Sequence, residues 1–148
     1  MGLFDWLRRR EAGEESPTLT FEEKEKNFEG LDIKGALDAH AKWRERLEEH
    51  IAGRSEEVLE VGTVSCDDNC ALGKWIYSVG RKKYGHLKEL EDLRATHADF
   101  HLSAGEVLIR HGTGNREQAL DHLNTEFKKL SGRVQLSLVR LYSKASRA

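Results

Sequence analysis

The sequence predicts an all-α fold, namely an antiparallel four-helix bundle with one short helix and an N-terminal tail. Three observations indicate this class. One proline occurs among 148 residues, good helix formers such as Ala, Leu, Glu, Lys and Arg are abundant, and apolar residues recur at steps of three and four. A chain of this length can bury a hydrophobic core without the help of disulfides.

The N-terminal segment, residues 1–29, is expected to be a tail or linker. It opens with an apolar and then basic stretch, "LFDWLRRR", at residues 3–10, and continues with the acidic, proline-bearing "EAGEESPT". Residues 3–10 allow a weak amphipathic contact with a membrane surface or a partner groove, and a mobile tail is the alternative. Because the apolar residues precede the arginines, the segment does not resemble a secretory signal, and we expect a cytoplasmic protein.

The bundle is expected to span residues 30–148. Its first helix covers residues 32–52, where steps of three and four define a stripe that includes Ile33, Leu37, His40, Leu47 and Ile51. Residues 54–66 form a connection of uncertain structure. A short helix follows over about residues 67–80.

Two long helices complete the predicted bundle, over residues 87–111 and 116–146. The "GTG" at residues 112–114 separates them. The last helix carries a stripe whose steps depart from a strict heptad near its end: Leu120, Leu123, Phe127, Leu130, Val134, Leu138 and Leu141. Such a stripe favours packing in a bundle over a long coiled coil.

The stretch "HADFH" places His97 and His101 four residues apart on one helix face. Residues at this spacing have Cβ atoms about 5–6 Å apart, so two imidazoles can converge on one metal ion. His40 and Cys70 lie on other core-facing stripes where an apolar residue is expected. One cysteine and three histidines form a donor set that favours Zn²⁺ over Mg²⁺ or Ca²⁺. Ordinary core or surface histidines are the alternative interpretation.

These residues lie in three short motifs: "HAKW" at residues 40–43, "CALGKW" at 70–75 and "HADFH" at 97–101. In this order and at these gaps, the motifs resemble those of the bacterial chemoreceptor zinc-binding domain, and we expect a stand-alone protein of this family. The resemblance covers roughly residues 30–143. It implies a four-helix bundle, often homodimeric, with Zn²⁺ held by His40, Cys70, His97 and His101. Trp43, Trp75 and Gly73 are then packing residues.

The resemblance also implies a sensory or regulatory protein. Members of the family are commonly attached to chemotaxis receptors or diguanylate cyclases, and respond to zinc or to oxidants such as hypochlorous acid. No receptor coiled coil or cyclase domain fits in 148 residues, so we expect signalling through a separate partner. Four protein ligands leave no open position on a tetrahedral zinc, and no nucleophile–base pair is visible, so we expect no enzyme activity.

Some alternatives remain open at this point. Cys66, four residues before Cys70, is a possible redox partner that could form a disulfide with it after oxidation, a competing metal ligand, or a small residue at the end of a loop. A hemerythrin-like iron-binding bundle and a purely structural dimerisation module are alternative functions. The net charge of −2 gives no support for nucleic-acid binding. His50, His86, His111 and His122 lack convergence and are interpreted as surface or terminal residues.

Overall fold

The computed structural model describes residues 2–14 and 17–147. Over these residues the chain is helical, without strands other than an isolated bridge between Phe28 and Leu31. The all-α prediction is confirmed. The elements are α1 (Leu3–Glu11), η1 (Glu23–Glu25), α2 (Ile33–Ile51), α3 (Val61–Val64), α4 (Ala71–Trp75), η2 (Ile76–Gly80), α5 (Arg81–Tyr84), α6 (Lys88–Gly112), α7 (Arg116–His122), η3 (Leu123–Phe127) and α8 (Lys128–Arg147).

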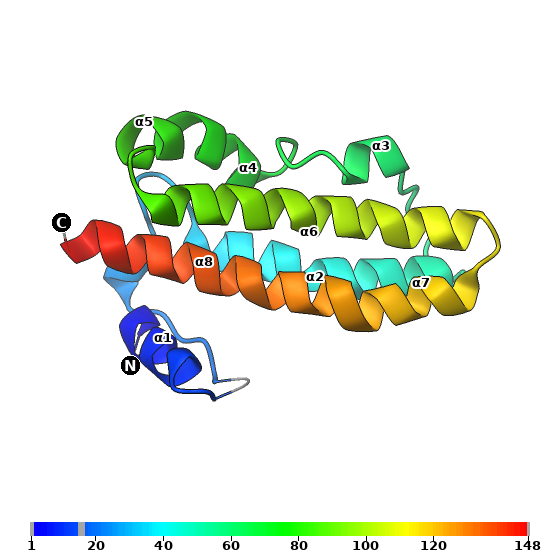
Figure 1. The fold of residues 1–148 in the computed structure, drawn as a ribbon, viewed down its shortest axis with the longest axis horizontal. Coiled ribbons are helices and arrows are strands. Elements are labelled where there is room, and N and C mark those ends of the chain that lie inside the picture. The colour runs from blue at the N-terminus through cyan, green and yellow to red at the C-terminus, as the bar shows by residue number, and fades with distance from the viewer. Residues whose placement is uncertain (1, 15–16, 148) are drawn as a thin grey trace.

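Four helical members run side by side and alternate in direction, as an antiparallel bundle requires (Figure 1). The first is α2 and the third is α6. The second consists of α3 and the continuous rod α4–η2–α5, and the fourth is the continuous rod α7–η3–α8. The elements η2 and η3 are single π-helical turns within these rods.

The predicted long helices agree closely with α2, α6 and the last rod, each within a residue or two of the expected ends. The short helix differs more, because it begins at Ala71 and continues to Tyr84. Its start lies later than expected because Cys70 has an extended backbone and caps the helix.

The core lies between α2, α6 and the last rod. Many apolar side chains of these helices are fully or almost fully buried, including Leu37, Leu47, Leu93, Phe100, Phe127 and Leu138. Burying a side chain of this size stabilises the fold by about 1.5–3 kcal/mol. The bundle is therefore held together by ordinary apolar packing along its length, and this packing fixes the helices that carry the polar residues described below.

The N-terminal segment is more ordered than a tail. Helix α1 packs against α8 (Figure 1), and Leu3, Trp6 and Leu7 are buried there. The carboxylate of Glu25 accepts hydrogen bonds from the Leu3 N–H on both of its oxygens, at 3.0 and 3.1 Å. The apolar side chains considered for contact with a membrane or a partner are thus largely used within the chain itself.

A cluster of aromatic rings connects the start of the bundle to its second member. The ring of Phe28 lies 5.1 Å from Trp75, 5.4 Å from Tyr84 and 5.3 Å from Tyr142. The indole N–H of Trp75 donates to the Glu29 carbonyl at 3.1 Å. Trp75 is therefore a packing residue, as expected, and it anchors helix α4 to the chain before α2.

Among the described residues, no helix combines the length and the apolar character needed to cross a membrane.

Candidate metal centre

Three segments bring four potential metal ligands together at the middle of the bundle. His40 comes from α2, Cys70 precedes α4, and His97 and His101 lie one turn apart on α6. One donor atom from each of the four lies within 4.8 Å of the donor atoms of the others. The structure therefore unites all four residues that the sequence predicted to converge.

Two of the histidines are oriented by backbone carbonyl groups. The Nδ1 atom of His40 lies 2.7 Å from the Ala36 oxygen, and the Nδ1 atom of His101 lies 2.9 Å from the Val64 oxygen. Because a carbonyl can only accept, Nδ1 must carry the proton in each ring. Each neutral ring then presents an unprotonated Nε2 to the centre, which is the form that binds a metal.

The distances between donor atoms fit a tetrahedral zinc. Typical Zn–N and Zn–S bond lengths place neighbouring nitrogens about 3.3 Å apart and nitrogen and sulfur about 3.6 Å apart. The Nε2 atom of His97 lies 3.0 Å from that of His40 and 3.2 Å from that of His101. The Cys70 Sγ lies 3.9, 3.3 and 3.7 Å from the Nε2 atoms of His40, His97 and His101.

The His97 imidazole differs from those of His40 and His101 in the hydrogen bonding of its Nδ1 atom. The ring is fully buried, and its Nδ1 has no hydrogen-bond partner among the described residues. A buried unpaired polar atom costs about 1–3 kcal/mol. The fold thus accepts a penalty to hold this ring where its Nε2 faces the other donors, which is expected if binding a cation compensates for it.

Burial also determines the protonation of the ring nitrogens. Loss of solvent lowers the pKa of His40 to about 4, opposed in part by the Ala36 carbonyl, and lowers that of His97 to about 2. It lowers the pKa of His101 as well. All three rings are therefore neutral near neutral pH, so their Nε2 lone pairs are available to a metal without prior loss of a proton.

Cys70 is positioned by the start of α4. Its sulfur accepts a hydrogen bond from the Gly73 N–H at 3.4 Å and caps the helix. Burial raises the pKa of the Cys70 thiol, and the neighbouring backbone N–H groups act in the opposite direction. Without a cation the thiol is protonated near neutral pH, so metal binding there must release a proton.

Gly73 permits a close approach that no other residue allows. A Cβ atom at this position would lie 1.7 Å from the Asp67 carbonyl oxygen. The loop carrying Asp67 therefore passes directly over the first turn of α4, which holds Cys70 in place. The expected role of Gly73 in packing is explained by this contact.

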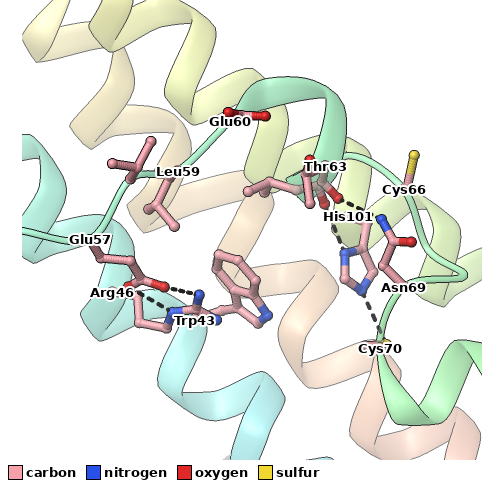
Figure 2. Close-up of a pocket in the computed structure, with 12 residues that line it drawn as sticks. Trp43, Arg46, Glu57, Leu59, Glu60, Thr63, Cys66, Asn69, Cys70 and His101 are labelled. Atoms are coloured by element: carbon pink, nitrogen blue, oxygen red, sulfur yellow. Dashed lines mark hydrogen bonds and ion pairs between the residues drawn. The ribbon is translucent and has the colours of Figure 1, made fainter.

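The remaining candidates lie away from the donor set. Trp43 is half-buried, and its ring centre lies 6.5 Å from that of His101. Cys66 is exposed, and its thiol donates to the Gly62 carbonyl at 3.1 Å. Figure 2 shows the Cys66 sulfur pointing away from Cys70 and His101.

Some supporting contacts have no signature in the sequence. The Ala36 and Val64 carbonyls act through backbone atoms, which any residue type provides. The ring of Phe100 packs 5.1 Å from His40 and 5.5 Å from His101. Phe100 lies within "HADFH", but its position there did not predict this contact.

The fold and the donor set define a helical bundle with a cysteine-and-three-histidine metal centre. The family model for the chemoreceptor zinc-binding domain matches residues 40–108, which include all four donors. This segment is therefore a chemoreceptor zinc-binding domain, and the resemblance inferred from the three motifs is confirmed. No curated protein and no solved structure matches the chain significantly.

Proposed function

We propose that the protein is a zinc-dependent sensory or regulatory module whose ion is held by His40, Cys70, His97 and His101. The single observation that carries this proposal is the convergence of three Nε2 atoms and one sulfur from three chain segments. When bound, Zn²⁺ would keep the Cys70 sulfur as a thiolate and fasten the start of α4 to α2 and α6. The chain's part is to orient the rings and to bury them in the bundle.

The donor set opposes an iron-binding alternative. Di-iron centres in helical bundles use bridging carboxylates together with histidines. The cluster found among the described residues contains a thiol and no carboxylate. A purely structural dimerisation module would leave unexplained why polar rings with oriented Nδ1 atoms occupy the core.

We infer that Cys70 is the element that responds to oxidants such as hypochlorous acid. In this reaction the thiolate sulfur takes the oxygen of hypochlorous acid to give a sulfenic acid, two electrons pass to chlorine, and chloride leaves. The oxidised sulfur no longer serves as a thiolate donor, so the first turn of α4 loses its attachment to the imidazoles. Cys66 could then act as a redox partner, its thiol condensing with the sulfenic acid to form a disulfide and water.

The signalling context extends this proposal. We expect a cytoplasmic homodimer without enzyme activity, in which residues 30–148 form the sensing unit and residues 1–29 an appended segment. Its partner would belong to a chemotaxis or cyclic-di-GMP signalling system, as the family implies. The short helical rod is the element best placed to communicate the state of the centre, because Cys70 caps its first turn.

Metal analysis of the full chain, purified without chelator, tests the proposal. We expect about one zinc per chain, no visible absorbance from iron, and loss of most zinc in Cys70→Ala. Cys66→Ala is the matched control and should retain its zinc. Equal zinc content in the two variants, or an iron chromophore in the wild type, would refute the assignment.

A second measurement examines the response. Adding zinc to the apo protein should slow hydrogen exchange across residues 66–80, because the cation joins this segment to α2 and α6. Unchanged exchange there would contradict a role for the short rod in signalling. Recovery of oxidised Cys66→Ser by added thiols at the wild-type rate would remove the proposed role of Cys66.

A further inference from the structure

A cavity of about 290 Å³ lies against the metal centre on the side of the α2–α3 connection (Figure 2). Its inner wall includes Cys70 and His101, and apolar side chains such as Leu59 and Val64 form other parts of the lining. The cavity therefore extends from the protein surface to two of the four donors. No role in zinc binding requires this space.

Among the four donors, Cys70 is the residue that remains partly accessible. His40, His97 and His101 are 4, 0 and 3% exposed, whereas Cys70 is half-buried. The nucleophilic atom of the centre is thus the one next to open space. A reagent small enough to enter the cavity would reach Cys70 and His101, whereas His40 and His97 do not line it.

The outer wall of the cavity is held by a surface ion pair. Arg46 of α2 pairs with Glu57 through two hydrogen bonds, and its guanidinium carbon lies 3.7 Å from the centre of the Trp43 ring. Glu57 belongs to residues 54–60, which have no helical structure. An exposed ion pair contributes only about 0–1 kcal/mol, so this wall can open at little cost.

A second cavity, of about 310 Å³, reaches Cys70 from another side, where it is also lined by His40. Its walls include α2 and α4 residues such as Ala36, Leu72 and Trp75, and Trp75 is anchored to Glu29. Helical residues and an anchored aromatic ring form most of this lining, beside the turn at residues 30–32. Part of the wall of the first cavity is instead the irregular segment 57–60, which a surface ion pair holds. The first cavity is therefore the more readily opened of the two.

We propose that the first cavity is the access route by which small reagents reach the Cys70 sulfur, and that the Arg46–Glu57 pair is its gate. This inference rests on the proposed function, since it assigns the route by which an oxidant reaches the responsive thiol. The class of reagent is a small molecule that tolerates both apolar and polar surroundings, because the lining combines apolar side chains such as Leu59 with charged ones such as Arg46 and Glu60. Larger reagents depend on opening of the gate.

The test is the rate at which iodoacetamide and the larger N-ethylmaleimide modify Cys70, followed by mass spectrometry in a Cys66→Ser background. Two substitutions fill the route, Thr63→Phe and Leu59→Trp, both at residues that line the first cavity. Ala39→Phe fills the second cavity and is the matched control. Either filled variant should slow modification about tenfold, and the control should stay within about twofold, since thiol reactivity follows access.

Opening the gate should have the opposite effect. Glu57→Gln removes the charge partner of Arg46 and should speed modification about threefold, more for N-ethylmaleimide than for iodoacetamide. Slower modification in Ala39→Phe but not in the two filled variants would overturn the proposal in favour of the second cavity. Unchanged rates in all variants would overturn it as well.

The experiment distinguishes failure of the proposed access route from failure of the proposed zinc site. Zinc content is measured on the same samples, and the rates are compared in both the zinc-loaded and chelator-treated protein. If the wild type holds no zinc, the proposed function fails, while the rates in the chelator-treated protein still decide which route leads to Cys70. Circular dichroism of each variant verifies that its helices are retained.

Discussion

The Nε2 atoms of His40 and His97 face each other at 3.0 Å in the core of the bundle. The Nδ1 proton of His40 is committed to the Ala36 carbonyl, so its Nε2 has no hydrogen to offer. His97 can bridge the gap only by placing its single proton on Nε2, which leaves its buried Nδ1 without a partner. In the absence of a cation, the buried Nδ1 of His97 therefore lacks a hydrogen-bond partner, and this should affect the stability of the protein.

Replacing His97 with leucine should separate stability from metal binding. His97→Leu removes a buried polar atom without a partner and fills a similar volume, so the chelator-treated variant should be about 1–3 kcal/mol more stable than the chelator-treated wild type. The same variant should lose most of its zinc. Urea unfolding with and without chelator measures both effects.

The control for this substitution is His111→Leu, which changes a half-buried histidine outside the donor set. It should leave zinc content unchanged and alter stability by less than about 0.5 kcal/mol. Destabilisation of the chelator-treated His97→Leu protein would show that the ring is well accommodated without a cation. Zinc would then not be needed to explain its position.

The chelator-treated protein should lose stability as the solution becomes acidic. The native pKa values of His40 and His97 are lowered to about 4 and about 2 because burial disfavours the charged ring. In the unfolded chain these groups titrate near 6.5, so below that pH the unfolded state binds more protons and gains stability. The stabilisation is thus complete above pH 6.5 and declines as the pH falls towards the native values.

The size of this loss of stability with falling pH follows from the same proton linkage. Two such histidines should lower the unfolding free energy by about 3 kcal/mol between pH 7.5 and pH 5.5. Urea unfolding of the chelator-treated protein across this range measures the decline, and His97→Leu should reduce it by about half. An identical pH dependence in the two proteins would contradict the burial of a neutral His97.

Parts of the centre could be predicted from the sequence because they follow helical periodicity. His97 and His101 share a face of one helix through their spacing, and His40 interrupts an apolar stripe in another. The carbonyls of Ala36 and Val64 could not be predicted in the same way. The Val64 contact in particular depends on how the α2–α3 connection folds over α6, which no local pattern specifies.

The ends and contacts of the helices also divide into those that a local sequence pattern predicts and those that it does not. The long helices were predicted closely because their apolar stripes extend over many turns. The short rod begins three or four residues later than expected because Cys70 itself is the cap. The docking of α1 was missed although Leu3, Trp6 and Leu7 have helical spacing, because the surface that receives them belongs to α8, more than 120 residues further along the chain.

The close approach at Gly73 predicts a strong effect from one methyl group. Gly73→Ala would place a Cβ 1.7 Å from the Asp67 carbonyl oxygen, so the loop or the first turn of α4 must move. Because Cys70 caps this turn, we expect zinc affinity to fall by about 10–100-fold, as for the loss of other contacts that orient ligands. Competition with a chromophoric chelator measures the affinity.

Gly132→Ala is the matched control for this change. Gly132 lies within α8, and a Cβ there would meet no atom within 4 Å. The substitution should leave zinc affinity unchanged and stabilise the protein by about 0.5–1 kcal/mol through helix propensity. Equal zinc affinity in Gly73→Ala and Gly132→Ala would show that the loop adapts without disturbing Cys70.

The buried carboxylate of Glu25 predicts how firmly α1 is held on the bundle. Glu25 is 1% exposed, and its oxygens accept from the N–H groups of Leu3 and Glu22. Glu25→Gln replaces one acceptor with an NH₂ group that faces a backbone donor, which should lower stability by about 1–3 kcal/mol. Hydrogen exchange across residues 3–11 should become faster, since the start of α1 loses its cap.

Glu23→Gln provides the comparison, because Glu23 is exposed on the same 3₁₀ turn and pairs with Lys26 at the surface. Hydrogen exchange across α1 in Glu23→Gln should match that of the wild type. If both variants leave α1 equally protected, the burial of Leu3, Trp6 and Leu7 alone fixes the helix against α8. If Glu25→Gln releases α1 while zinc content stays constant, the N-terminal segment and the metal centre are independent units of the structure.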